Sequence, residues 1–86
     1  MSILKVSIEQ IKAARALLGW SQADHAEKSG VSLPTIKRLE AAGGTLGGLA
    51  TTAEKLVGAL ESAGVIFIEE NGEGPGVRLR KRPTTE

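Results

Sequence analysis

The chain has 86 residues, 41% of them hydrophobic and 24% charged, with a formal net charge of +1. That length supports one domain with a modest core. The lack of cysteine excludes disulfides, cysteine catalysis and a thiolate metal site, and the single histidine argues against a His-based metal site. No apolar run could span a bilayer and no signal-peptide pattern opens the chain, so we expect a cytoplasmic protein without a cofactor.

The first predicted helix covers residues 7–18. Ser7 and Gln10 have the spacing of a capping box, in which each satisfies a free backbone N–H of the other. Apolar residues then recur at helical intervals up to Gly19, a residue type that commonly ends helices.

Two shorter helices follow. The second begins with Ser21 as its N-cap and ends at Gly30. Ser32 caps the third, in which Pro34 is tolerable because first-turn N–H groups have no partner within the helix. Gly43 and the glycine after it end this helix.

The last third of the chain predicts one more helix and a hairpin. Residues 43–50 are glycine-rich and predict a loop, and Thr51 with Glu54 predicts a capping box that opens a helix ending at Gly64. VIFIEE has strand composition, NGEGPG turn composition, and VRLRKR alternates apolar with basic residues, which predicts a hairpin with a six-residue connection. We divide the chain into a helical domain (1–64), a β element (65–82) and a disordered tail (83–86).

Only the short stretch SGVS separates the second helix from the third. They cannot pack side by side across it, so the arrangement is a helix-turn-helix. Ala26 is small where the helices would cross, and Gly30 can adopt the positive φ of the turn. The apolar residues that can be buried beneath the turn are Val31, Ile36 and Leu39.

The stretch RALLGWSQADHAEKSGVSLPTIKRLE resembles the DNA-binding domain of the Cro and phage-repressor type, often called the xenobiotic-response-element family. The resemblance implies a mainly α, lambda-repressor-like fold of about four helices, here followed by a C-terminal β-hairpin. It also implies that the third helix enters the major groove and that Gln22 binds a phosphate. The residues that would face DNA are Ser32, Leu33, Pro34, Thr35, Lys37 and Arg38.

The start of the third helix is unusual for a DNA reader. Leu33 and Pro34 offer only apolar contacts, for instance to thymine methyl groups, so base readout would depend on the polar side chains that follow. The alternative is an ordinary solvated helix face.

Two opposite charges lie on apolar helix faces. Arg15 is four residues after Ile11, and Glu40 is four residues after Ile36. Isolated charges there would be costly, but a bidentate pair satisfies both. We predict an Arg15–Glu40 salt bridge that braces the motif, as the family resemblance also implies; the alternative is that both side chains extend to solvent.

His25 stands where the family usually has leucine. Counted from Ser21 as N-cap, Trp20 and His25 occupy the two positions of a hydrophobic staple, so we expect the imidazole to pack against the indole. A pH switch or a protein contact is the alternative role.

Charge is unevenly distributed along the chain. Residues 1–40 carry six Lys/Arg against four Asp/Glu (+2), residues 41–76 one against five (−4), and residues 77–86 four against one (+3). On the second strand the arginines share one face and could contact flanking phosphates or pair with Glu69 and Glu70 across the hairpin; we favour pairing. These arginines are Arg78, Arg80 and Arg82.

The first strand has apolar side chains on both faces, which predicts that a second copy covers the face not used by the core. The expected dimerisation residues are Val65, Ile66, Phe67, Ile68, Val77 and Leu79. The function expected from these features is a homodimeric, sequence-specific transcriptional regulator on an inverted-repeat operator, with RNA polymerase as a further partner to consider. The alternative is a protein-binding module, an antitoxin or antiactivator, that keeps the shape without reading DNA. The sequence contains no cluster of acid and base groups, so we do not expect an enzyme.

Overall fold

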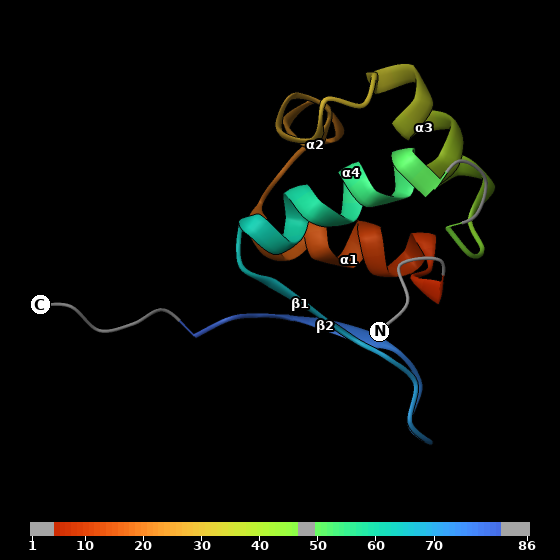
Figure 1. Ribbon diagram of the computed structural model, residues 1–86, viewed down its shortest axis with the longest axis vertical. Helices are drawn as coiled ribbons and strands as arrows, with labels where there is room; N and C mark the ends of the chain where they lie inside the picture. Colours follow the sequence, from red (N-terminus) through yellow and green to blue (C-terminus); the bar gives the residue numbers. More distant parts are fainter. Residues whose placement is uncertain (1–4, 47–49, 82–86) are drawn as a thin grey trace, which may run out of the picture.

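The computed structural model describes residues 5–46 and 50–81. The elements, in chain order, are α1 (Ile8–Leu18), α2 (Gln22–Ser29), α3 (Leu33–Ala42), α4 (Ala50–Ser62), β1 (Val65–Ile68) and β2 (Gly76–Leu79). Helices α1 and α4 pack together at the centre, α2 and α3 lie on one side of them, and the antiparallel β1–β2 hairpin lies on the other (Figure 1). The predicted mainly α, lambda-repressor-like fold with a C-terminal hairpin is therefore confirmed.

The predicted ends of the first three helices are confirmed. Ser7 forms a complete capping box with Gln10, and Ser21 forms one with Asp24. Ser32 caps α3 by accepting the N–H of the third helical residue. These local bonds satisfy N–H groups that have no partner within the helix, so they fix where each helix begins. No helix in the described ranges is long and apolar enough to cross a membrane.

Two predictions at the C-terminal end are wrong. Ala50 is already helical, so Thr51 lies inside α4 and does not cap it; packing of Ala53 and Leu56 in the core sets the helix face, and nothing at Thr51 opposes helical geometry. Strand β2 begins at Gly76, because that residue pairs with Ile68, and the connection is residues 69–75. Of the predicted loop at 43–50, residues 47–49 lie outside the described ranges, as do Arg82 and the predicted tail 83–86.

The core is aliphatic and lies between the helices and the hairpin. Leu46 closes one side of it, where its N–H donates to the carbonyl of Val6 at 2.7 Å and Ser7 forms a β-bridge with Thr45. Burying aliphatic side chains of this size contributes about 1.5–3 kcal/mol each. The buried apolar residues are Val6, Ile8, Ile11, Ala14, Val31, Ile36, Leu46, Ala53, Leu56, Val57, Leu60 and Val65.

Candidate nucleic-acid interface

The turn between α2 and α3 has the geometry that a helix-turn-helix requires. Gly30 ends α2 in the left-handed region, with φ of 78°, and its N–H donates to the carbonyl of Ala26. The next N–H, that of Val31, donates to the hydroxyl of Ser29 at 3.1 Å, while the Val31 side chain is buried in the core. This turn positions α3 as a helix with one face on the core and one face free.

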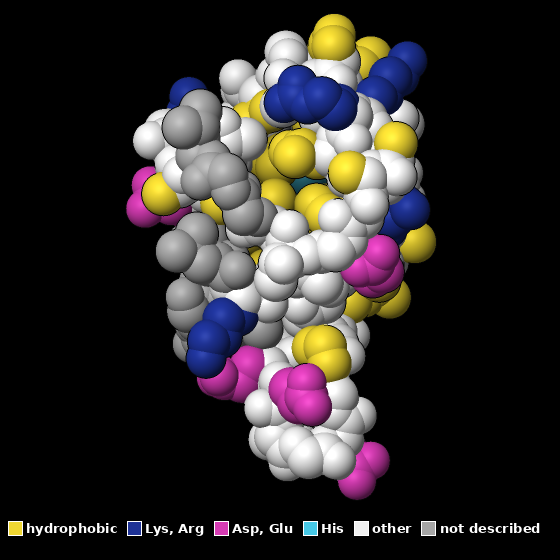
Figure 2. Space-filling view, turned by 90° about the vertical axis from the view of Figure 1, so that its right-hand side faces the viewer, with side chains coloured by type: hydrophobic (Ala, Val, Ile, Leu, Met, Phe, Trp, Pro, Cys, Tyr) yellow, Lys and Arg dark blue, Asp and Glu magenta, His cyan; other side chains and the backbone are white. Residues whose placement is uncertain are grey.

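The free face of α3 carries the predicted reading residues. Pro34, Lys37 and Arg38 are exposed, and Leu33 and Thr35 are half-buried. Neither Lys37 nor Arg38 makes a hydrogen bond or ion pair with another described residue, so both cations are available to a phosphate or a base edge. On the face in Figure 2, Lys and Arg side chains are concentrated toward the end of the molecule that carries α3, and most acidic side chains lie toward the hairpin.

The two hydroxyls at the start of α3 are already engaged. The Ser32 hydroxyl donates to Oγ1 of Thr35 at 2.8 Å and also accepts the Thr35 N–H at 3.4 Å. Each hydroxyl keeps acceptor capacity, because an oxygen has two lone pairs. Contact with DNA through these residues would therefore add to a small preformed network.

The predicted salt bridge between Arg15 and Glu40 is present and bidentate. Arg15 Nε lies 2.8 Å from Oε2 of Glu40 and Nη2 lies 2.7 Å from Oε1, while Nη1 donates to the carbonyl of Trp20 at 2.9 Å. The Glu40 side chain is only 4% exposed. Burial by itself would raise the pKa of Glu40, but hydrogen bonds from Arg15 and Gln22 outweigh it and lower that pKa. The pair joins α1 to α3, and Arg15 also ties α1 to Trp20, which precedes the N-cap of α2.

Gln22, expected to bind a phosphate, is part of this network. Its Nε2 donates to Oε1 of Glu40 at 3.0 Å, and its side chain is half-buried. Sequence reasoning placed Gln22 at the first turn of α2 but missed this bond, because nothing in the local sequence shows which way the amide turns. Binding a phosphate through Nε2 would use its second N–H or break the bond to Glu40.

His25 packs against Trp20 as predicted, and it also has a bond that the sequence did not indicate. The two ring centroids are 6.0 Å apart at an angle of 45°. His25 is fully buried, and Nε2 lies 3.0 Å from the carbonyl oxygen of Leu56 in α4. Because a carbonyl only accepts, Nε2 carries the proton, and Nδ1 has no partner among the described residues. Burial, above all, lowers the pKa of His25.

The hairpin does not bring Arg78 or Arg80 opposite the two glutamates. Arg78 lies across from Ile66 in the strand register, whereas Glu69 and Glu70 follow β1 in the connection. The predicted pairing of Arg78 and Arg80 with Glu69 and Glu70 across the hairpin is therefore wrong. The reason is the short ladder, which ends at Ile68 opposite Gly76.

The six predicted dimerisation residues occupy different environments. Val65 is 1% exposed and its side chain belongs to the chain's own core, so this side chain is not available to a second copy. Phe67 and Val77 are half-buried against the same core. Ile66 and Ile68 alternate with these inward side chains, are half-buried and lie on the outer face, while Leu79 is 42% exposed.

Gln10 has a structural role that sequence reasoning missed. Beyond its capping bond to Ser7, its Nε2 donates to the carbonyl oxygens of Ile68 at 3.3 Å and Gly76 at 2.9 Å, one on each strand. The side chain is 4% exposed. One buried amide therefore joins the start of α1 to both strands of the hairpin.

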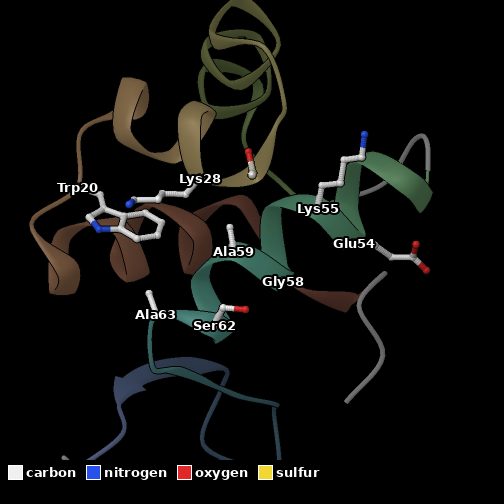
Figure 3. A pocket seen from close by; sticks show the side chains of 9 residues that line it. Trp20, Lys28, Glu54, Lys55, Gly58, Ala59, Ser62 and Ala63 are labelled. Atoms are coloured by element: carbon white, nitrogen blue, oxygen red, sulfur yellow. The ribbon is translucent and has the colours of Figure 1, made fainter.

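A groove of about 540 Å³ lies between α2 and α4, away from the predicted reading residues. The side chain of Lys28 extends toward the indole of Trp20 along this groove, and Lys55 and Glu54 lie toward its other end (Figure 3). The small residues Gly58, Ala59, Ser62 and Ala63 line the α4 side. None of the residues expected to face DNA contributes to this groove.

A steep two-helix turn, an exposed face on the second helix and a buried salt bridge behind it define a helix-turn-helix protein. Residues 11–47 match the model of a family described as helix-turn-helix, so this segment is similar to the Cro and repressor type of that motif. The chain thus carries a DNA-binding motif, and the matched family is one of DNA-binding rather than catalytic domains. A search of curated proteins gave no match.

Proposed function

We propose that this protein is a sequence-specific transcriptional regulator that acts as a homodimer on an inverted-repeat operator. The observation that carries the proposal is the exposed, unpaired Lys37 and Arg38 on the free face of a helix fixed from behind by the Arg15–Glu40 pair. In this reading α3 lies in the major groove, where these cations contact base edges or phosphates and Pro34 makes apolar contact. A regulator of this kind binds promoter DNA, so we place the protein in the cytoplasm.

Dimerisation is part of the proposal because half-sites of this motif lie about 34 Å apart, one helical turn of DNA. Something outside α2 and α3 must set that spacing. Residues 65–82 are the segment we assign to this task, because the outer hairpin face carries Ile66 and Ile68 and the strands have unpaired edges.

The experiment is a footprint of the protein across its own promoter, followed by anisotropy titrations on the protected site and on random DNA. We expect an inverted repeat to be protected, and random DNA to bind at least about a thousandfold more weakly at physiological salt. A full-length variant that no longer dimerises should bind a half-site and lose the preference for half-site spacing. Equal affinity for operator and random DNA would contradict sequence-specific readout.

A protein-binding module is the second candidate, and the start of α3 favours it. Leu33 and Pro34 are apolar, and the hydroxyls of Ser32 and Thr35 bond to each other. Among the described residues of this face, that leaves two free cations, Lys37 and Arg38. A salt titration separates the two candidates, because the counterions that a protein releases from DNA gain less free energy at higher salt, so binding to DNA weakens steeply. A flat salt dependence, or no binding to any DNA at low salt, would favour the protein-binding module.

A further inference from the structure

We infer that two copies of this chain pair through the free edge of β1, so that the two hairpins form one four-stranded antiparallel sheet in the order β2–β1–β1–β2. This inference rests on the proposed homodimer and specifies its interface. The strand register, the distribution of charge on the two strands and the position of α3 relative to the sheet carry it.

The register shows which backbone groups face the edges. The N–H of Arg80 donates to the carbonyl of Gly64 at 2.6 Å, so these two residues stand at a hydrogen-bonding position of the ladder. Bonded and non-bonded pairs alternate along an antiparallel ladder, which makes Ile66–Arg78 bonded and Phe67–Val77 non-bonded. The N–H and C=O groups of Val65 and Phe67 therefore point to the free edge of β1. Those of Val77 and Leu79 point to the free edge of β2.

Charge distinguishes the two edges. Strand β1 carries no charged residue from Val65 to Ile68, whereas β2 and the residues after it carry Arg78, Arg80 and Lys81. If two copies of β2 paired about Arg78 or Leu79, arginines would lie directly opposite each other, and like charges at that position are destabilising. Pairing about Val77 would place Leu79 opposite Pro75, which has no N–H to donate.

Both strand edges have a hollow bounded by a helix. Along β2, the hollow next to Gly76 and Val77 is bounded by α1 residues that include Glu9 and Ala13. Along β1, a hollow of about 380 Å³ is bordered by Glu61 of α4, by β1 itself and by Arg80. Open space therefore does not distinguish the two edges, and the charge on the strands decides between them.

The position of α3 excludes stacking through the outer sheet faces. The hairpin lies at one end of the molecule and α3 toward the other (Figure 1). If two outer faces stacked, the two-fold axis would lie in the plane of the sheets, and the two α3 helices would point in opposite directions. Antiparallel pairing at an edge places the axis perpendicular to the sheet, so both α3 helices lie on the same side, as one DNA duplex requires.

Paired about Ile66 or Phe67, two β1 strands would exchange about four backbone hydrogen bonds. Ile66 of one copy would then lie beside Ile66 or Ile68 of the other on the outer face. The side chains of Val65 and Phe67 would stay on the core side, as they are within one chain. A four-stranded sheet is also more stable than an isolated hairpin.

The test is amide hydrogen exchange of the full chain, with sedimentation at the same concentrations. In the dimer, the Phe67 amide should exchange at least about tenfold more slowly than in the diluted monomer, because it gains a partner. The amides of Val77 and Leu79 should stay fast in both. A dimer that protects Val77 and Leu79 instead, or none of these amides, would overturn pairing through β1 while leaving the homodimer intact. A monomer at tens of micromolar, on and off DNA, would overturn the homodimer itself.

A matched pair of variants tests the same interface independently. Ile66→Lys would place two ammonium groups close together across the two-fold axis and should weaken the dimer by about tenfold or more. Leu79→Lys adds the same charge at an exposed position on β2. Pairing through β1 leaves Leu79 outside the interface, contrary to the dimerisation role expected from the sequence, so this variant should leave dimer affinity unchanged. Circular dichroism and thermal melting show whether each variant is folded. If Ile66→Lys folds and dimerises like the parent, pairing through β1 is wrong.

Discussion

Replacing Arg15 with alanine should strongly destabilise the fold. The substitution removes two bonds to Glu40 and one to the Trp20 carbonyl, and it leaves a carboxylate that is 4% exposed with Gln22 as its remaining partner. Breaking one side of a buried pair costs about 3–5 kcal/mol. An 86-residue domain has a total stability of roughly 4–13 kcal/mol, so this is a large share of it.

The loss should appear in thermal melting and in urea unfolding. For a domain of this size, each kcal/mol shifts the melting midpoint by about 4–8 °C, so we expect a decrease of at least about 12 °C. Lys12→Ala is the matched control, since it removes an exposed cation from the same helix and should change stability by no more than about 0.5 kcal/mol. An Arg15→Ala variant that melts within two or so degrees of the parent would refute the reasoning.

Three further predictions concern the interface, pH and the hairpin. At least one of Lys37→Ala and Arg38→Ala should relax operator preference, by about 1–3 kcal/mol at one base position, in competition binding; parent-like behaviour of both variants would show that α3 does not read DNA. The free energy of unfolding should be constant above pH 6.5, the ordinary pKa of histidine, and should fall as the pH decreases below it. Burial lowers the pKa of His25 in the folded protein, so the unfolded chain takes up the proton first. Urea unfolding at several pH values measures this pH dependence, and His25→Leu should remove the decrease in stability down to about pH 4.5. Below that pH the stability of this variant should also fall, because the folded protein lowers the pKa of Glu40. Gln10→Ala should increase amide exchange in β1 and β2 more than in α3, because it removes both bonds from α1 to the hairpin.

Features determined by short-range sequence could be predicted, because their causes lie within a few residues. Ser7, Ser21 and Ser32 cap helices through bonds to residues three positions ahead, and the spacing of the sequence contains that information. The Arg15–Glu40 pair could also be predicted, because each charge lies on an apolar face and two opposite charges were the means to satisfy both.

Features that depend on side-chain direction or distant packing could not be predicted. Gln22 lies at the expected position, but only the fold shows that its amide turns back to Glu40. Thr51 has the spacing of a cap, yet core packing extends the helix through it. The exposed side chains of Lys37 and Arg38 indicate a DNA-reading face without indicating a base sequence, since that depends on contacts with the partner.

The bonds of Gln10 have a consequence for biosynthesis. Its partners Ile68 and Gly76 are 58 and 66 residues further along the chain, so α1 leaves the ribosome well before the segment it binds. At synthesis rates of roughly 5–20 residues per second, the segment from Val65 to Leu79 takes about 1–3 s to add. During that interval the side of the core that Val65 and Phe67 later cover is exposed to water, which makes the nascent chain a substrate for chaperones and prone to aggregation until its last strand arrives.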